Sequence, residues 1–511
     1  MRKFFKTVLI VTVFSFCEKF LGFLYRIYLS RTIGAEGVGM YQVALSVFAF
    51  LLTLCCSGTP ITVSRLMTKY SSLGEKDRVR SVITAGITFT FLFSTLICLL
   101  CLMLKGYLKL IFADERCISI FLIVLPGLIF TSVYAVLRGV FWGNKDFLPY
   151  SVIELLEEIC MILVGVILIN HATGVYQGAF RAGVAVLISY LFSFTLASIT
   201  FFIRKNKFKN PKKELKPLLS SALPVTAMRT VTSLAVSLVS IILPIRLVAS
   251  GYSNNEAMSL FGSAVGQAIP LLFIPTTLIG SFTLVVIPEI SENYYKKRNI
   301  YLKNDVEKTV KLTTFLTALF VPVFFVLGEE IGVLVFGNTE CGKYLTASSY
   351  LMLFIGLSNI TTSILNSIGQ ETKTLIYCMI SGVFMLISIW VLPLFIGIYA
   401  LLVGFTFVYG LTTLLNIILM LKKLPVKPKI FKFFGLSIAF MLPTILLGEM
   451  LKKIFLPYLG IFLTFLITST ALIIFNGALY VGFNLIELSA ITTTFTKRKK
   501  KKSAMLSTAQ N

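Results

Sequence analysis

The stretch VLIVTVFSFCEKFLGFLYRIYL, from Val8 to Leu29, decides how the rest of the chain is interpreted. A helix of about 20 apolar residues, rising 1.5 Å per residue, crosses a hydrocarbon core roughly 30 Å thick. This stretch is long enough, yet it contains Glu18, Lys19 and Arg26. A charge in mid-membrane costs at least about 2.5–3.5 kcal/mol unless it faces protein or water. We therefore expect a membrane-spanning helix that lines an aqueous cavity.

The composition of the whole chain is that of a polytopic membrane protein. Of the 511 residues, 57% are hydrophobic and only 14% are charged, and the mean hydropathy is +0.89. Soluble domains contain about 25% charged residues. Apolar segments long enough to span the membrane recur along the chain, and the sequence predicts fourteen of them. The predicted fold class is therefore an all-α integral membrane protein.

The distribution of basic residues predicts the topology. The formal net charge of +25 would suit a nucleic-acid partner, but most of the 47 Lys and Arg residues fall in alternate loops and at both ends of the chain. Membrane proteins concentrate Lys and Arg on the cytoplasmic side. Both termini are therefore predicted to be cytoplasmic, and no nucleic-acid partner is needed. The basic tail, KRKKKK at 497–502, is expected near anionic headgroups.

Two pairs of segments indicate an internal repeat. Residues 37–66 resemble 259–291, and residues 132–154 resemble 358–381. Parallel repeats of this kind suit an alternating-access transporter whose site lies between the two halves. Prolines in the long segments 218–247 and 258–288 predict bends or breaks. The predicted organisation is an N-lobe of helices 1–6 (1–203), a basic linker (204–217), a C-lobe of helices 7–12 (218–421), helices 13–14 (422–484) and a basic tail (485–511).

Cations deep in two predicted helices are the candidate substrate-binding residues. Lys19, Gly22 and Arg26 share one face of the first helix at 100° per residue. Arg229 lies at a similar depth in the helix that opens the second half. A guanidinium group can hold two oxygens of a phosphate, so an anionic headgroup is the expected ligand. The alternatives are that Arg26 extends to the membrane surface and that Lys19 pairs with a carboxylate.

Carboxylates in apolar surroundings form a second candidate group. Glu154, Glu157 and Glu158 fall within the first part of the predicted fifth helix, and Glu18 lies beside Lys19. Such carboxylates cannot all be ionised and unpaired without a large cost. One interpretation is a coupling site for a monovalent cation or a proton. The other is structural ion pairing, for which the candidate partners are Lys19, Arg138 and Lys145.

The sequence gives no indication of catalysis. It contains no P-loop, zincin or nucleophile-elbow motif, so neither ATP hydrolysis nor catalytic residues are expected, and no cofactor is implied. His171 is the only histidine, so a histidine-based metal site is not expected. Cys98 and Cys101 lie in an apolar run and are interpreted as small buried residues. The oxidation state of two further cysteines stays open, namely Cys117 and Cys341.

Several stretches together resemble one family. They are KFLGFLYRIYLSRTIGAEGVGMYQVALSVF (19–48), SGTPITVSRL (57–66), VLRGVFWGNKDFLPYSVIELLEE (136–158), ALPVTAMR (222–229) and LFGSAVGQAIPLLFIPTTLIGSFTLVVIPEIS (260–291). In their order and spacing the chain resembles the stage V sporulation protein B family. This family belongs to the polysaccharide-transporter branch of the multidrug/oligosaccharidyl-lipid/polysaccharide exporter superfamily.

The resemblance implies a fold and a function. The fold would have fourteen transmembrane helices, with two six-helix lobes around a V-shaped cavity, in a bacterial cell membrane. The function would be flipping of lipid-linked glycans, here peptidoglycan precursors for the spore cortex, and cell-wall synthesis enzymes are candidate partners. In related lipid II flippases, cations of the first helix contact the pyrophosphate, and Lys19 and Arg26 occupy matching positions. Lys19 stands where many relatives have arginine. Few polar residues line the second helix, so sugar contacts are not carried over.

Three functional hypotheses follow. The first is a flippase in which Lys19, Arg26 and Arg229 hold the pyrophosphate of a polyprenyl-linked saccharide while its tail stays in lipid. The second is a cation-coupled multidrug exporter of the same superfamily. The cationic first helix argues against it, because it would repel cationic drugs. The third is a membrane scaffold that recruits cell-wall enzymes.

Overall fold

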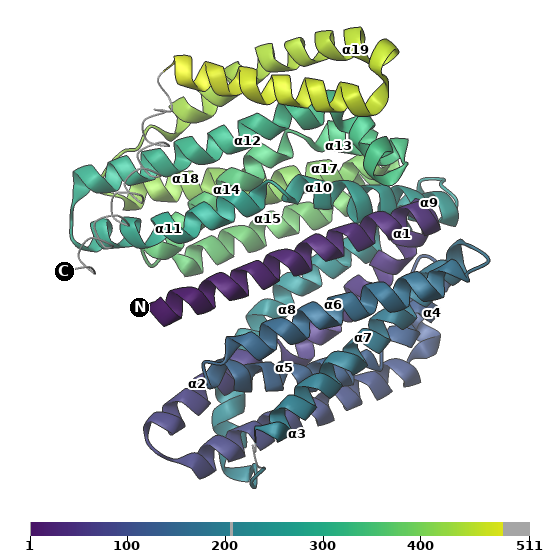
Figure 1. The fold of residues 1–511 in the computed structure, drawn as a ribbon, viewed down its shortest axis with the longest axis vertical. Helices are drawn as coiled ribbons and strands as arrows, with labels where there is room; N and C mark the ends of the chain where they lie inside the picture. Colours follow the sequence, from purple (N-terminus) through teal and green to yellow (C-terminus); the bar gives the residue numbers. More distant parts are fainter. Residues whose placement is uncertain (1, 205–207, 484–511) are drawn as a thin grey trace, which may run out of the picture. The chain divides into compact units, whose positions relative to one another are not determined.

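The computed structural model describes residues 2–204 and 208–483, and Figure 1 labels its helices. These residues are almost entirely helical, and they contain no β-strand. Nine helices of this part of the chain are long and apolar enough to cross a membrane, or up to eleven if each of two bent pairs is one span. The predicted fold class, an all-α membrane protein, is confirmed, whereas the count of fourteen spans stays a prediction.

The chain divides into two compact units. Unit 1 comprises the described residues of 1–267, 336–338 and 385–401, and unit 2 those of 268–335, 339–384 and 402–511. The helices that lie wholly or mostly in unit 1 are α1 (Arg2–Cys56), α2 (Thr59–Ser72), α3 (Lys76–Met103), η1 (Lys105–Leu110), α4 (Glu115–Val124), α5 (Gly127–Gly143), α6 (Phe147–Asn170), α7 (Val175–Ile203), α8 (Lys212–Ala249), α9 (Asn254–Phe261), η2 (Gly262–Ala268), α16 (Pro393–Ile396) and η3 (Gly397–Tyr399).

Unit 2 is built from the remaining helices. They are α10 (Ile269–Phe273), α11 (Thr276–Tyr295), α12 (Asn299–Phe336), α13 (Thr339–Ser348), α14 (Leu351–Ser367), α15 (Glu371–Val391), α17 (Ala400–Phe405), η4 (Thr406–Leu411), α18 (Thr412–Lys423) and α19 (Ile430–Gly482). In this unit α19 is tied to α12 by an ion pair between Lys452 and Glu330, at 2.9 Å. The predicted basic tail, 485–511, lies outside the described residues.

Helix α1 is longer than the predicted span 8–29. It runs from Arg2 to Cys56, and its only interruption is Gly34, with φ 68° and ψ 179°. A positive φ is readily adopted by glycine and rarely by other residues. A single residue therefore replaces the loop expected between the first two predicted spans. Gly460 breaks α19 in the same way.

Helix α8 begins at Lys212, inside the predicted linker 204–217. The buried carboxylate of Glu214 accepts a hydrogen bond from Arg78 of α3 at 2.7 Å, which fixes this first turn against unit 1. The helix therefore begins six residues before the predicted span 218–247. The division into lobes by internal repeat stays a prediction.

The two proline-containing long segments behave differently. Helix α8 continues through its prolines, including Pro224 and Pro244. The segment 258–288 is interrupted instead, because a π-helical turn (η2) and α10 separate α9 from α11. In membrane helices, neighbouring groups can satisfy the carbonyl that a proline leaves unpaired. The predicted break is thus present in the second segment, whereas the first segment is one continuous helix in which a bend stays a prediction.

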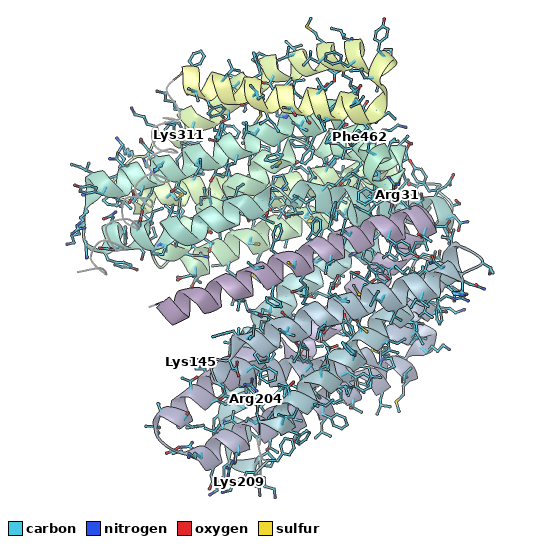
Figure 2. All side chains as sticks on the ribbon, viewed as in Figure 1. Arg31, Lys145, Arg204, Lys209, Lys311 and Phe462 are labelled. Atoms are coloured by element: carbon cyan, nitrogen blue, oxygen red, sulfur yellow. The ribbon has the colours of Figure 1, made fainter. Side chains whose placement is uncertain are left out.

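Charged residues gather at one end of unit 1. Arg204 at the end of α7 pairs with Asp146, which precedes α6, and Lys209 pairs with Asp77 at the start of α3. In Figure 2 Lys145, Arg204 and Lys209 lie at the same end of these helices, and Arg31 lies at the opposite end. This grouping is what the predicted topology requires. The side of the membrane on which each end lies stays a prediction.

Helix α5 lies at the centre of unit 1. Val136, Leu137 and Val140 are buried in an apolar core shared with α2 and α3. At Gly139 the helix approaches α2 so closely that an added methyl group would lie 2.6 to 3.1 Å from backbone atoms of Pro60. One side of α5 is thereby fixed against α2, and the other side is available for a polar cavity.

Candidate functional site

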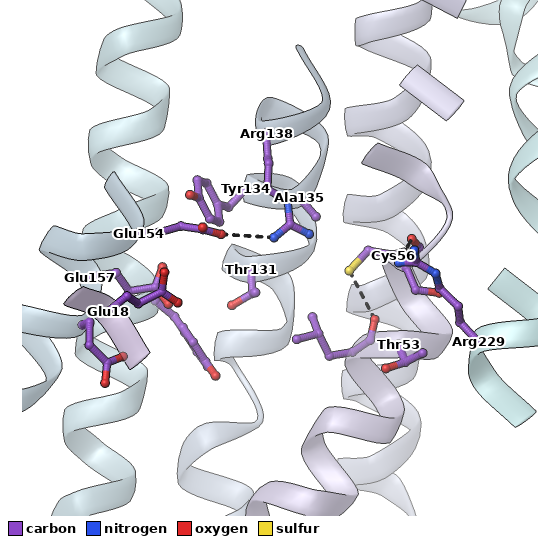
Figure 3. Close-up of a pocket in the computed structure, with 14 residues that line it drawn as sticks. Glu18, Thr53, Cys56, Thr131, Tyr134, Ala135, Arg138, Glu154, Glu157 and Arg229 are labelled. Atoms are coloured by element: carbon purple, nitrogen blue, oxygen red, sulfur yellow. Dashed lines mark hydrogen bonds and ion pairs between the residues drawn. The ribbon is translucent and has the colours of Figure 1, made fainter. Parts of the chain in front are cut away.

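Unit 1 contains a cavity of about 320 Å³, shown in Figure 3. Helices α1, α5, α6, α7 and α8 contribute to its walls. The lining combines four carboxylates with two guanidinium groups and several hydroxyl groups. Its residues are Glu18, Leu52, Thr53, Cys56, Ser57, Thr131, Tyr134, Ala135, Arg138, Glu154, Glu157, Glu158, Tyr190 and Arg229.

Helix α6 supplies three of the four carboxylates. Glu154, Glu157 and Glu158 stand at i, i+3 and i+4, which places them on one side of a helix. Glu158 also lies against Gly22 of α1, since a methyl group added at Gly22 would come within 2.8 Å of its Oε1 atom. The glycine at this position of α1 therefore leaves space for the Glu158 carboxylate.

Helix α5 contributes a polar stripe that the sequence interpretation missed. Thr131, Tyr134, Ala135 and Arg138 are spaced i, i+3, i+4 and i+7, and all four line the cavity. This spacing is visible in the sequence and marks one face of a helix. Sequence reasoning used Arg138 only as a candidate ion-pair partner and overlooked the threonine and the tyrosine.

One ion pair connects α5 and α6. The Nη1 atom of Arg138 lies 3.3 Å from Oε1 of Glu154, and the side chains are 31% and 19% exposed. The guanidinium group also lies over the ring of Trp142, 5.3 Å from its centre. Of the three candidate pairings, the one with Arg138 is therefore present. The described residues show no ion pair between these carboxylates and Lys19 or Lys145.

Several polar atoms of the lining have no hydrogen-bond partner among the described residues. They are Oγ of Ser57, Oγ1 of Thr131, the hydroxyl group of Tyr134 and Nε of Arg138. The Tyr134 side chain is only 4% exposed. Buried polar groups in native proteins are nearly always hydrogen-bonded. The cavity is therefore suited to a ligand that offers its own donors and acceptors.

Arg229 lies on the other side of the cavity from the carboxylates. Figure 3 shows Glu18, Glu154 and Glu157 at one side, and Arg229 at the opposite side. Its side chain is exposed, and Nη1 donates a hydrogen bond to the Ser57 carbonyl at 3.3 Å. Within residues 2–204 and 208–483 no carboxylate forms an ion pair with Arg229. This arginine is thus free to bind an anion.

The first helix presents Glu18, and not Lys19, to this cavity. Lys19 is exposed and does not line it. Arg26 is partly buried, and its Nη1 donates a hydrogen bond to the carbonyl of Gly266 at 3.0 Å. The structure therefore brings Glu18, Arg229 and the α6 carboxylates together, while Lys19 and Arg26 lie elsewhere on α1.

No group of three or more His, Cys, Asp or Glu side chains in the described part of the chain could hold a metal ion. The cysteines of the described residues, which include Cys117 and Cys341, are not joined by disulfide bonds.

Comparisons with known proteins identify relatives of the chain. The sequence profile described as polysaccharide biosynthesis protein matches residues 4–294. Stage V sporulation protein B of Bacillus subtilis (strain 168) is 25% identical over 452 residues, which are 86% of this chain and 87% of the relative. Lipid II flippase MurJ of the same organism is 21% identical over 423 residues, covering 75% and 76% of the two chains.

Solved structures show the same fold. One described as lipid II flippase MurJ in an inward closed conformation aligns with a TM-score of 0.69 and 16% identity, over 93% of this chain and 99% of that chain. An inward-facing multidrug resistance MATE family transporter aligns with a TM-score of 0.64 and 15% identity, over 83% and 95%. The chain therefore shares the fold of these membrane transporters, and it belongs to the polysaccharide biosynthesis protein family, with a resemblance to stage V sporulation protein B that extends over most of both chains.

Proposed function

We propose that this protein is an alternating-access flippase for a polyprenyl-pyrophosphate-linked saccharide, and that its substrate is a peptidoglycan precursor for spore cortex synthesis. The observation that carries the proposal is Arg229, an arginine without an ion-pair partner in the described structure, which lines a polar cavity whose walls include helices long and apolar enough to cross a membrane. The names of two relatives, stage V sporulation protein B and lipid II flippase MurJ, support it.

Of the three proposed substrate-binding cations, Arg229 of α8 lines the cavity, whereas Lys19 and Arg26 of α1 lie outside it. Arg229 presents a planar fork of N–H groups, which matches two oxygens of a phosphate. Lys19 and Arg26 add positive charge on α1 and would contact the pyrophosphate during its passage. The polyprenyl tail would stay in the hydrocarbon, so that only the headgroup crosses.

The driving force would come from the membrane potential or from an ion gradient. Under this proposal the carboxylates of Glu154, Glu157 and Glu158 are the candidate site for a coupling monovalent cation or proton, and both termini lie in the cytoplasm. The described pairing of Glu154 with Arg138 gives this carboxylate a structural role as well. The protein would act as a transporter and not as an enzyme, and cell-wall synthesis enzymes are candidate partners.

Reconstitution tests the proposal. Vesicles containing the purified protein and labelled undecaprenyl-pyrophosphoryl disaccharide would be assayed for headgroup accessibility to an impermeant reagent, with and without an imposed potential. Hydrogen bonds to a charged group contribute about 1.5–3 kcal/mol. Arg229→Gln should therefore slow flipping about tenfold or more, whereas the matched surface variant Arg80→Gln should not. Wild-type flipping by Arg229→Gln and by the double variant Lys19→Gln/Arg26→Gln would refute the proposal.

A cation-coupled multidrug exporter is a second candidate, because four carboxylates line the cavity. It predicts that vesicles export a lipophilic cation, and that export requires Glu157 and Glu158. The same vesicles distinguish the two functions, since a drug exporter would not move the lipid-linked disaccharide. A scaffold would move neither probe.

A further inference from the structure

The cavity of unit 1 has two electrically different sides. The four carboxylates of Glu18, Glu154, Glu157 and Glu158 outnumber the guanidinium groups of Arg138 and Arg229. Of these four carboxylates, only Glu154 forms an ion pair with another described residue, and its partner is Arg138. A pyrophosphate placed beside the other three carboxylates would be repelled. An anion therefore fits at Arg229 only, and the carboxylate side requires a positive group.

The chemistry of the lining indicates what kind of positive group fits. In the part of the chain that the structure describes, no group of three or more His, Cys, Asp or Glu side chains could hold a metal ion. A primary ammonium group carries three N–H donors that point in different directions, so it can contact separate acceptors. The unpartnered hydroxyl group of Tyr134, 4% exposed, and Oγ1 of Thr131 lie in the same lining and supply further acceptors.

The volume of the cavity limits how much of a ligand enters it. At about 320 Å³ the cavity lies at the lower end of the range for small-molecule sites, which is about 300–1,000 Å³. This volume accommodates a short amine-bearing branch of a headgroup. Arg229 is exposed, so it can reach a phosphate that stays outside the enclosed part.

We propose that Glu18, Glu157 and Glu158 bind a primary ammonium group on the translocated headgroup while Arg229 binds its phosphate. The substrate class is then a polyprenyl-pyrophosphate-linked saccharide that carries a free amine, on the sugar or on an attached peptide. This inference rests on the proposed flippase function and narrows its substrate. It assigns the carboxylates to substrate selection and not to a coupling ion.

Two matched lipids test the inference in vesicles that contain the full chain. The first probe is undecaprenyl-pyrophosphoryl disaccharide with a peptide that ends in a lysine with a free side-chain amine, and the second is the same lipid with that amine acetylated. We expect the free-amine probe to be flipped about tenfold faster or more, since acetylation removes the charge and two of the three donors. In Glu157→Gln/Glu158→Gln this ratio should fall to about one. Glu115→Gln should preserve it, because Glu115 is an exposed residue paired with Lys109.

Each outcome supports or overturns one of the two proposals. Equal flipping of both probes by the unsubstituted chain would overturn the ammonium site and leave the flippase function intact. Flipping of neither probe would overturn the flippase function and the site with it. A rate that is equal for both probes but follows an imposed sodium or proton gradient, and is lost in the double variant, would assign the carboxylates to coupling instead. The comparison of probes on the unsubstituted chain does not depend on the folding of any variant.

Discussion

Removal of the ion pair between Arg138 and Glu154 gives a quantitative test of the cavity. The two side chains are 31% and 19% exposed and 3.3 Å apart, so the pair is neither fully buried nor fully solvated. Arg138→Met leaves the Glu154 carboxylate without its ion-pair partner in a cavity that holds three other carboxylates. It also removes the contact between Arg138 and the Trp142 ring. Glu154→Gln leaves the guanidinium group without its carboxylate.

The expected magnitude lies between two known limits. Exposed ion pairs contribute about 0.2–1 kcal/mol, whereas the loss of one partner of a buried pair costs about 3–5 kcal/mol. For the partial exposure observed, Arg138→Met should lower the free energy of unfolding by about 3 kcal/mol, including about 0.5–1 kcal/mol from the cation–π contact. Glu154→Gln should lower it by about 2 kcal/mol, and the double variant by about 3 kcal/mol. The coupling energy is then about 2 kcal/mol.

Unfolding of the purified variants in mixed micelles, titrated with a denaturing detergent and followed by circular dichroism, measures these values. The double-variant cycle cancels the Trp142 contribution, because that contact is lost in both variants that lack Arg138. A double variant whose effect equals the sum of the single effects within about 0.5 kcal/mol would refute the reasoning. The pair would then behave as a solvated surface pair, and the Glu154 carboxylate would not depend on Arg138.

Two further predictions concern packing. In unit 2, Lys452→Met should lower the free energy of unfolding by about 3–5 kcal/mol, because the Glu330 side chain, 8% exposed, is left as an unpaired buried charge. The double variant Lys452→Met/Glu330→Gln should recover part of this loss in the same unfolding assay. Gly139→Ala should destabilise the protein by about 3 kcal/mol, since the added methyl group meets the Pro60 backbone. Gly382→Ala, which has open space at that position, should be neutral or stabilising. Thermal unfolding compares the two variants, and equal effects would contradict the packing described.

The membrane character and the charged candidates could be predicted from the sequence. A charge inside a long apolar run is conspicuous because it conflicts with the cost of burying it. Glu154, Glu157 and Glu158 were identified in this way, and the structure places all three in one cavity. The stripe of Thr131 and Tyr134 could have been found by the same helical spacing. It was missed because a threonine and a tyrosine in an apolar helix carry no such cost.

The rotation of α1 about its own axis could not be predicted. Glu18 and Lys19 are adjacent, about 100° apart on the helix, and the charge pattern alone does not decide which of them faces the cavity. The close approach of Gly22 to Glu158 fixes this choice, and it joins two helices that are distant in the sequence. The early start of α8 has the same origin, because Glu214 there pairs with Arg78 of α3.

The break at Gly34 divides α1 into two helical segments that are joined at this one residue. Glu18 lies on the first segment and Thr53 on the second, and both line the same cavity. Glu18 is sixteen residues from Gly34, which at 1.5 Å per residue is about 24 Å along the helix. A rotation of about 10° at this single residue would therefore displace Glu18 by about 4 Å, more than the diameter of a water molecule. The width of a polar cavity in this protein thus depends on the two backbone torsions of one glycine far outside it.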